Sequence, residues 1–323
     1  MTDAAADTEP SLAHLPVAIF AVVMGLAGLA LALAAAEHAL GAGRTASTVA
    51  LGATLLAFAL AALAYAVKAA RHPGAVVAEW RHPVRIAFFP AISISLLLIA
   101  TALAPGLPGL AEPLWLAGAA LQAVLTLAVV ASWIGHRAFE HGHLTPAWFI
   151  PAVGNVVAPV AGAALGHAEL SWLFFSAGLV FWSVLLTLVM NRLIFHDPLP
   201  GRLVPTLVIL IAPPAVAFIA WLRLTGEIDA FARILLNTGY VFAAVVLTQA
   251  PRFRRLPFAL SWWALSFPVA ALAVASLLFA AETGSLPHRL VGLGLAGLLL
   301  AIVTALALRT LRALAAREIC RPE

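Results

Sequence analysis

Proline alternates between successive hydrophobic segments of this chain. Every second segment contains proline well inside its length, and the segments between them carry it only at their entrances, if at all. The interior prolines are Pro16, Pro90, Pro151, Pro159, Pro205, Pro213, Pro214, Pro257 and Pro268. A proline inside a helix removes a backbone hydrogen bond and pushes against the carbonyl four residues earlier, so in a membrane it is tolerated where protein or water meets the freed groups. The alternation therefore predicts helical hairpins whose proline-kinked helices face inward and line a pore.

The composition places these segments in a membrane. Hydrophobic residues make up 63% of the chain and charged residues 10%, with a mean hydropathy of +1.05, whereas a soluble domain has about 25% charged residues. A membrane-spanning helix needs roughly 20 apolar residues, and no short alternating segments typical of a transmembrane barrel occur. The fold class predicted is an all-α integral membrane protein with ten transmembrane helices, arranged as five hairpins around a central pore with the odd helices inside. The expected spans are 14–36, 46–69, 84–103, 114–135, 149–166, 170–194, 203–223, 230–250, 258–281 and 286–311.

Basic residues predict the orientation. Fourteen of the 18 Lys and Arg follow even-numbered spans, and only Arg44, Arg223, Arg233 and Arg289 fall on the other side. Cytoplasmic loops retain positive charge, so both termini are expected in the cytoplasm of a multi-pass inner (plasma) membrane protein. Residues 14–315 form one channel domain, between a disordered tail at 1–13 and a short tail at 316–323. The net charge of +4 is interpreted as a solvated basic rim and not as a nucleic-acid-binding surface.

Ionisable residues are missing from the middle of every span. Proton relays, ion-coupled carriers and intramembrane catalysts usually place such residues there, so a proton pump or an aspartyl protease is disfavoured. Asn155, between the breaks at Pro151 and Pro159, is the strongest polar candidate for the pore wall. An uncharged pore could still prefer anions, because half-helices that begin at prolines present partial positive charge.

The sequence contains little that indicates a metal site, a disulfide or a catalytic site. The group His136, Glu140, His141 and His143 could share a metal, but it has no thiolate and is interpreted as a polar loop. The single cysteine, Cys320, excludes an intrachain disulfide. No phosphate-binding glycine loop or hydrolase motif occurs. No cofactor, metal site or catalytic residue is therefore predicted, and the chain is not expected to be an enzyme.

Four motifs resemble one family. They are His14-Leu15-Pro16 through Phe20 to Met24-Gly25-Leu26, then Glu79 to Arg85 with Phe88-Phe89-Pro90, then Thr145 to Asn155, and finally Trp262 to Pro268. In order, spacing and topology they resemble the tellurite-resistance and dicarboxylate transporter family, which includes the bacterial TehA proteins and the slow-type anion channels of plant guard cells. The resemblance covers about residues 12–315. It implies ten helices in five quasi-symmetric hairpins, a pore in each protomer and a homotrimer.

The resemblance also implies a phenylalanine plug in the ninth helix, and the matching residue is Phe267. Its place before Pro268 favours a non-helical backbone beside a local break. A phenyl ring there would block ions sterically and by dewetting, since it carries no charge to compensate the dehydration of an ion. The alternative is an ordinary packing phenylalanine. Further pore-lining candidates are Pro16, Phe20, Phe88, Asn155, Pro214 and Pro268.

The function expected is a passive channel for small inorganic anions such as chloride and nitrate. Tellurite resistance, if present, would follow from anion traffic and would not need a dedicated tellurite site. The first alternative is a dicarboxylate or sulfite carrier of the same family, and a more distant one is a membrane-embedded enzyme or scaffold. The expected partners are small anions, membrane lipid and two further copies of the chain.

Overall fold

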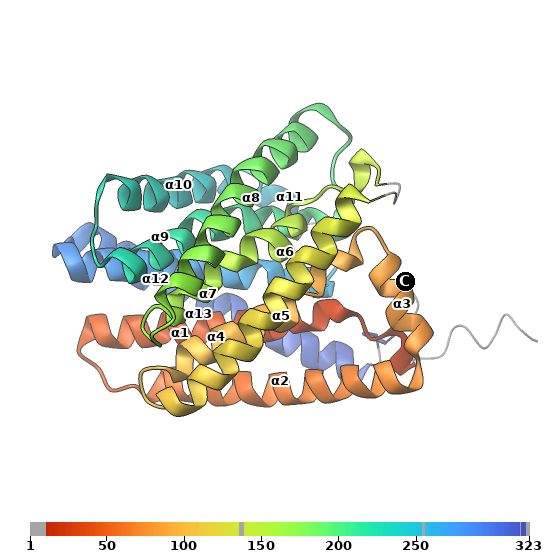
Figure 1. The fold of residues 1–323 in the computed structure, drawn as a ribbon, viewed down its shortest axis with the longest axis horizontal. Coiled ribbons are helices and arrows are strands. Elements are labelled where there is room, and N and C mark those ends of the chain that lie inside the picture. The colour runs from red at the N-terminus through yellow and green to blue at the C-terminus, as the bar shows by residue number, and fades with distance from the viewer. Residues whose placement is uncertain (1–10, 136–138, 254–255, 317, 321–323) are drawn as a thin grey trace, which may run out of the picture.

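The computed structural model describes residues 11–135, 139–253, 256–316 and 318–320, so most of the predicted N-terminal tail and part of the C-terminal tail lie outside it. All regular structure in these residues is helical, and the long helices run roughly along one axis (Figure 1). The long helices are α1 (Phe20–Leu40), α2 (Thr45–Arg71), α4 (Ala91–Leu103), α5 (Pro108–Ile134), α8 (Ala168–Phe195), α9 (Ala212–Thr225), α10 (Ala230–Leu247), α12 (Ser266–Thr283) and α13 (Leu286–Ala315). The short ones are α3 (Pro73–Arg81), α6 (Phe149–Val153), α7 (Ala158–Gly162) and α11 (Ala250–Phe253).

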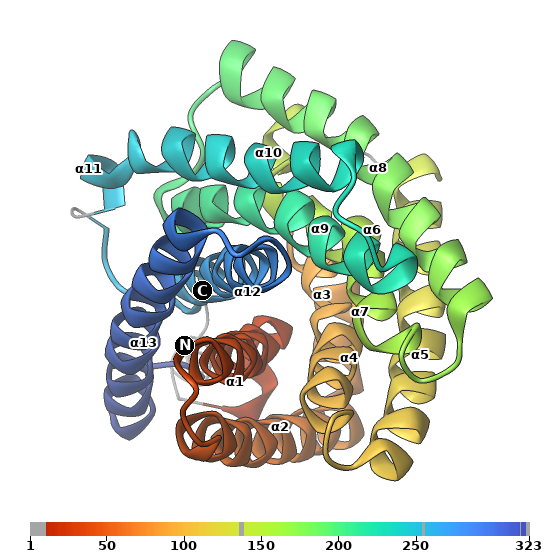
Figure 2. The ribbon, with the colours of Figure 1, turned by 90° about the vertical axis from the view of Figure 1, so that its left-hand side faces the viewer.

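These helices form two concentric rings. Viewed end-on, α1, α4, α6 with α7, α9 and α12 surround the centre, and α2, α5, α8, α10 and α13 lie outside them (Figure 2). Burial agrees with this division. Among the segments long enough to span a membrane, 56–83% of the apolar window is buried in the inner ones and 11–33% in the outer ones. The prediction that the odd, proline-bearing helices lie inside is confirmed, but proline is not confined to them, because the outer helix α5 carries Pro113 inside its length.

Nine segments of the described residues are long and apolar enough to cross a membrane. The fifth predicted span corresponds to Pro146–Gly162, a shorter apolar helix, so the count of ten stays a prediction. The all-helical membrane fold itself is confirmed.

Proline breaks the inner helices in a regular way. A 3₁₀ segment precedes or interrupts the α-helix in all five: Val17–Ile19, Arg85–Phe88, Gly154–Val157, Gly201–Ile211 and Leu260–Leu265. Such segments rarely exceed three or four residues, and inside a helix they often mark a hinge. The 11 residues of Gly201–Ile211 are therefore unusual. Four of these segments lie at the start of their helices, whereas Gly154–Val157 lies in the second half of Pro146–Gly162.

Side chains also close the first hairpin. Gly41 ends α1 with a φ of 67°, a left-handed conformation that glycine adopts without strain. The Glu37 carboxylate then accepts hydrogen bonds from the Ala46 and Ser47 amides, the former at 2.6 Å. A carboxylate at a helix N-terminus satisfies free N–H groups and complements the helix dipole. Glu37 thus fixes where α2 begins.

Helices α1 and α12 close the inner ring through a tight contact at Gly25. A Cβ atom at this position would lie 2.3 Å from the Ser266 hydroxyl oxygen and 2.7 Å from the Trp263 ring. We expect Gly25→Ala to destabilise the protein by about 1–3 kcal/mol, because the surrounding side chains must move. Thermal unfolding of the detergent-solubilised protein measures this effect.

Gly294→Ala in α13 is the matched control, since nothing lies within 4 Å of its Cβ position. This variant should unfold at the native temperature or slightly above it, because alanine favours a helix. Equal unfolding temperatures for the two variants would contradict the tight contact.

Candidate pore

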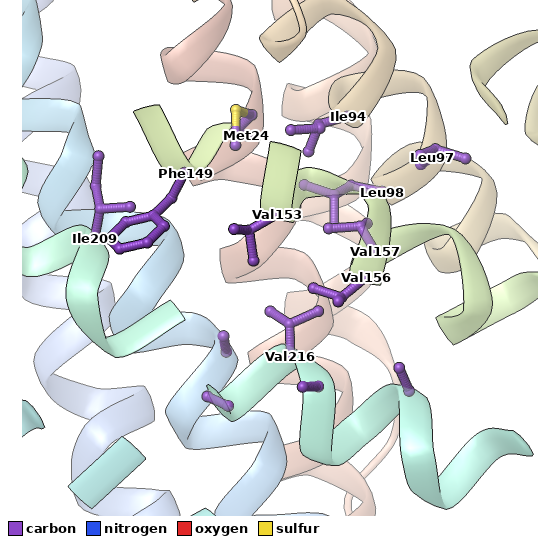
Figure 3. Packing of buried hydrophobic residues seen from close by; sticks show 14 of the residues in the cluster. Met24, Ile94, Leu97, Leu98, Phe149, Val153, Val156, Val157, Ile209 and Val216 are labelled. Carbon is purple, nitrogen blue, oxygen red and sulfur yellow. The ribbon is translucent and has the colours of Figure 1, made fainter. Parts of the chain in front are cut away.

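The centre of the inner ring contains a small cavity of about 80 Å³. Each of the five inner helices contributes to its wall, for example through Met24, Ile94, Val153, Val216 and Phe267. Figure 3 shows the first four of these side chains gathered from different helices around one space. A water molecule needs about 10–15 Å³ of such volume, so the cavity is large enough for a small ion with a few water molecules.

No ionisable side chain lines this cavity in the described residues. The lining residues with polar side-chain atoms are Ser261 and Trp263, and both side chains already have partners. The Ser261 hydroxyl donates to the Arg202 carbonyl, and the Trp263 indole donates to the Thr310 hydroxyl at 2.9 Å. A narrow apolar constriction of this kind resists wetting and so blocks ions.

Phe267 lies on the cavity wall in the first turn of α12, next to Pro268, which also lines the cavity. A Cβ atom on Gly28 of α1 would lie 3.5 Å from the Phe267 ring, so the ring lies close to the backbone of α1. The expectation of a non-helical backbone at Phe267 is wrong, since the residue belongs to the helix. Pro268 is tolerated there because N–H groups in the first turn have no intrahelical acceptor.

The other candidates divide into two groups. Phe88 lines the central cavity, and Pro16 lines a wider space beside it. Phe20, Asn155 and Pro214 are buried but line neither space in the described structure. The Phe20 ring packs edge-on against Phe58 and Tyr65 of α2. The pore role of these three residues stays a prediction.

The wider space, which we call the vestibule, has a volume of about 600 Å³ and lies at the end where the inner helices begin. Four residues line both spaces, so they adjoin: Ala18, Phe88, Leu260 and Ser261. The ionisable side chains on the vestibule wall are Glu79, His82, Arg85, Arg202 and Glu318. A charged vestibule thus leads to an uncharged constriction.

Comparison with known proteins identifies the family. The family model described as SLAC1, voltage-dependent anion channel, matches residues 14–311. The chain belongs to this family. It is 31% identical over 268 residues to the tellurite resistance protein TehA homolog of Haemophilus influenzae, covering 82% of this chain and 81% of that protein. The resemblance seen in the sequence motifs is confirmed.

Plant members of the voltage-dependent anion channel family also match. The S-type anion channels SLAH2 and SLAH3 of Arabidopsis thaliana are 28% identical over 249 residues and 30% identical over 240 residues. The alignments cover 76% and 73% of this chain but only 48% and 38% of the plant proteins. The chain therefore spans less than half the length of these relatives. Both relatives are named as anion channels.

Asn155 belongs to a polar network between the inner and outer rings. Its amide donates to the Thr126 hydroxyl at 3.1 Å and to the Ala152 carbonyl at 2.7 Å. Thr126 and Gln122 of α5 donate to the Pro151 carbonyl at 2.8 and 3.2 Å, and Ser93 donates to Gln122 at 2.7 Å. Carbonyls freed by the break are thus satisfied from the outer ring. Sequence reasoning placed Asn155 beside the break but missed its partners on α5.

A second buried network supports the vestibule. The Lys68 ammonium donates to the Glu79 carboxylate at 2.6 Å and to the Leu15 carbonyl at 2.7 Å. Glu79 also accepts from the Tyr65 hydroxyl at 2.9 Å and the Val17 amide at 2.8 Å. Lys68 is 1% exposed and Glu79 is 3% exposed. The network joins α2 and α3 to the start of the first inner helix, and no pattern in the sequence predicts it.

The described residues of the histidine group after α5 contact other protein groups. The His141 ring stacks on His196, the His141 carbonyl accepts from Arg192, and the Glu140 amide donates to the His143 ring. His136 lies outside the described residues. Within those residues, no group of three or more His, Cys, Asp or Glu is arranged to hold a metal.

Proposed function

We propose that this chain is a passive channel for small inorganic anions, chloride and nitrate, with Phe267 as the gate. The observation that carries this proposal is the uncharged central cavity, which all five inner helices line and which Phe267 narrows. An ion that crosses such a cavity must shed part of its water where no charged side chain of the described residues compensates the loss. Anions that dehydrate easily do so at the lowest cost.

The broken helices support anions over cations. The α-helical parts of four inner helices begin at Phe20, Ala91, Ala212 and Ser266, after their 3₁₀ segments. Helix N-termini carry partial positive charge. Near one break, the Ser95 hydroxyl donates to the Ala91 carbonyl at 2.6 Å and so occupies one acceptor position of that oxygen.

The setting of the channel is part of the proposal. We propose that the vestibule and both termini face the cytoplasm and that the protein lies in the inner (plasma) membrane, and the excess of Lys and Arg after even-numbered spans supports this orientation. A homotrimer with one pore per protomer, and a part in tellurite resistance through anion traffic, are further expectations from the family.

Reversal potentials in planar bilayers test the proposal. The protein carrying Phe267→Ala is reconstituted in a potassium chloride gradient, so that the current is large enough to measure. We expect the current to reverse near the chloride equilibrium potential, and to shift in the direction that shows higher permeability when nitrate replaces chloride, because nitrate dehydrates more easily. Reversal at the potassium potential would contradict the proposal. Saturable uptake of labelled malate or sulfite without current would favour the carrier.

A further inference from the structure

We propose that Trp263 and Thr310 are positioning residues for the gate, and that their hydrogen bond couples Phe267 to the outer helix α13. The coupling rests on the proposed gating role of Phe267 and adds to it the contact that keeps the gate closed. Three observations support it: the place of Trp263 between the cavity and the outer ring, its contacts with the start of α12, and the tight packing around the Phe267 ring.

Trp263 connects the central cavity with the outer ring. It lies in the 3₁₀ segment Leu260–Leu265 and lines the cavity, and its indole N–H donates to the Thr310 hydroxyl at 2.9 Å. Thr310 belongs to α13, which lies beside both α12 and α1 (Figure 2). Trp263 is 1% exposed and Thr310 is 6% exposed. A buried N–H group that loses its acceptor is costly, so this bond holds the indole against α13.

Trp263 also fixes the start of the helix that carries the gate. Its carbonyl accepts both the backbone amide and the side-chain hydroxyl of Ser266, the hydroxyl at 2.6 Å. Ser266 is the first residue of α12, and Phe267 is the second. Trp263 therefore sets the point at which the 3₁₀ segment becomes an α-helix, and such points often act as hinges. The direction of the Phe267 side chain depends on this junction.

Helix α1 leaves little free space beside the two aromatic residues. A Cβ atom on Gly28 would lie 3.5 Å from the Phe267 ring, and one on Gly25 would lie 2.7 Å from the Trp263 ring. Closely packed groups of this kind shift together between discrete arrangements and do not deform gradually. Loss of the hydrogen bond to Thr310 therefore releases the junction and lets the Phe267 ring leave the cavity wall.

Chloride current through Thr310→Val in planar bilayers tests the coupling. Valine has nearly the shape of threonine but no hydroxyl, so the change removes the acceptor of the Trp263 indole. We expect the current to rise at least about threefold in otherwise native protein and to stay unchanged when Phe267→Ala is already present, because the gate is then absent. Thr310→Ser keeps a hydroxyl and should conduct like the native protein.

Thr304→Val is the matched control, since Thr304 is an exposed threonine on the same helix. It should leave the current unchanged. Size-exclusion chromatography checks that each variant is folded. If Thr310→Val does not fold, Trp263→Phe takes its place, because it removes the same hydrogen bond from the donor side.

Fluorine NMR measures the position of the gate without any current. With 4-fluorophenylalanine at position 267, we expect Thr310→Val to shift or broaden the fluorine resonance and Thr304→Val to leave it unchanged, because only the first change displaces the ring. This measurement uses the full chain in detergent.

Three outcomes would overturn the coupling. The first is an unchanged fluorine resonance in folded Thr310→Val protein. The second is an unchanged current in this variant while Phe267→Ala conducts, and the third is an equal rise in current with and without Phe267, which would indicate damage elsewhere in the pore. If Phe267→Ala itself carries no anion current, the proposed channel function fails, whereas a fluorine shift confined to Thr310→Val still shows that Thr310 positions Phe267.

Discussion

Replacing Phe267 with alanine is expected to raise chloride current at least about tenfold at equal amounts of protein. The ring lies on the wall of a cavity of only about 80 Å³, so its removal widens the narrowest space and lets water in. A barrier lowered by only about 1.4 kcal/mol already gives a tenfold higher rate. Single-channel and macroscopic currents in planar bilayers measure the change.

A series of substitutions at Phe267 distinguishes a gating effect from a loss of folded protein. Phe267→Leu should give an intermediate current and Phe267→Trp a current no larger than the native one, because the effect follows side-chain volume. Phe195→Ala is the matched control, since Phe195 is 74% exposed on the outer helix α8. Folding is checked by size-exclusion chromatography. Equal currents in folded native protein and Phe267→Ala would remove Phe267 as the gate.

The ring architecture was predictable because it depends on patterns that the sequence carries directly. Long apolar segments identify the helices, and interior prolines such as Pro90 and Pro268 separate inner helices from outer ones. The form of the breaks was not predictable. A 3₁₀ and an α-helical turn differ little in energy, and packing around Gly201–Ile211 decides between them. The same holds for Phe267, whose helical conformation depends on its place in the first turn of α12.

The site was predicted only in part, because contacts between segments that are distant in the sequence decide the rest. Phe267, Pro268 and Phe88 came from motifs, and all three line the central cavity. Asn155 was selected because it is polar and lies between two prolines, but its amide contacts Thr126, 29 positions away on α5. Single-sequence reasoning cannot supply such a partner. The vestibule was missed because its wall combines side chains from distant segments, among them Arg85, Arg202 and Glu318.

Lys68→Met is expected to destabilise the protein by about 3–5 kcal/mol, because it leaves the Glu79 carboxylate buried without its countercharge. Lys68 and Glu79 are almost fully buried and 2.6 Å apart. For a chain of this size, the loss corresponds to a decrease in unfolding temperature on the order of 10 °C. Thermal unfolding in detergent, followed by size-exclusion chromatography, measures it.

The double variant Lys68→Met with Glu79→Leu should recover part of the lost stability, since it removes the unpaired charge but leaves the Val17 amide, the Tyr65 hydroxyl and the Leu15 carbonyl without these partners. Arg71→Met, an exposed cation near the end of the same helix, is the control and should leave unfolding unchanged. An equal decrease in unfolding temperature for Lys68→Met and Arg71→Met would show that the buried ion pair contributes no more to stability than an exposed cation does. Where folded Lys68→Met protein is obtained, its chloride current should fall, because the unpaired Glu79 carboxylate on the vestibule wall repels the anions that approach Phe267.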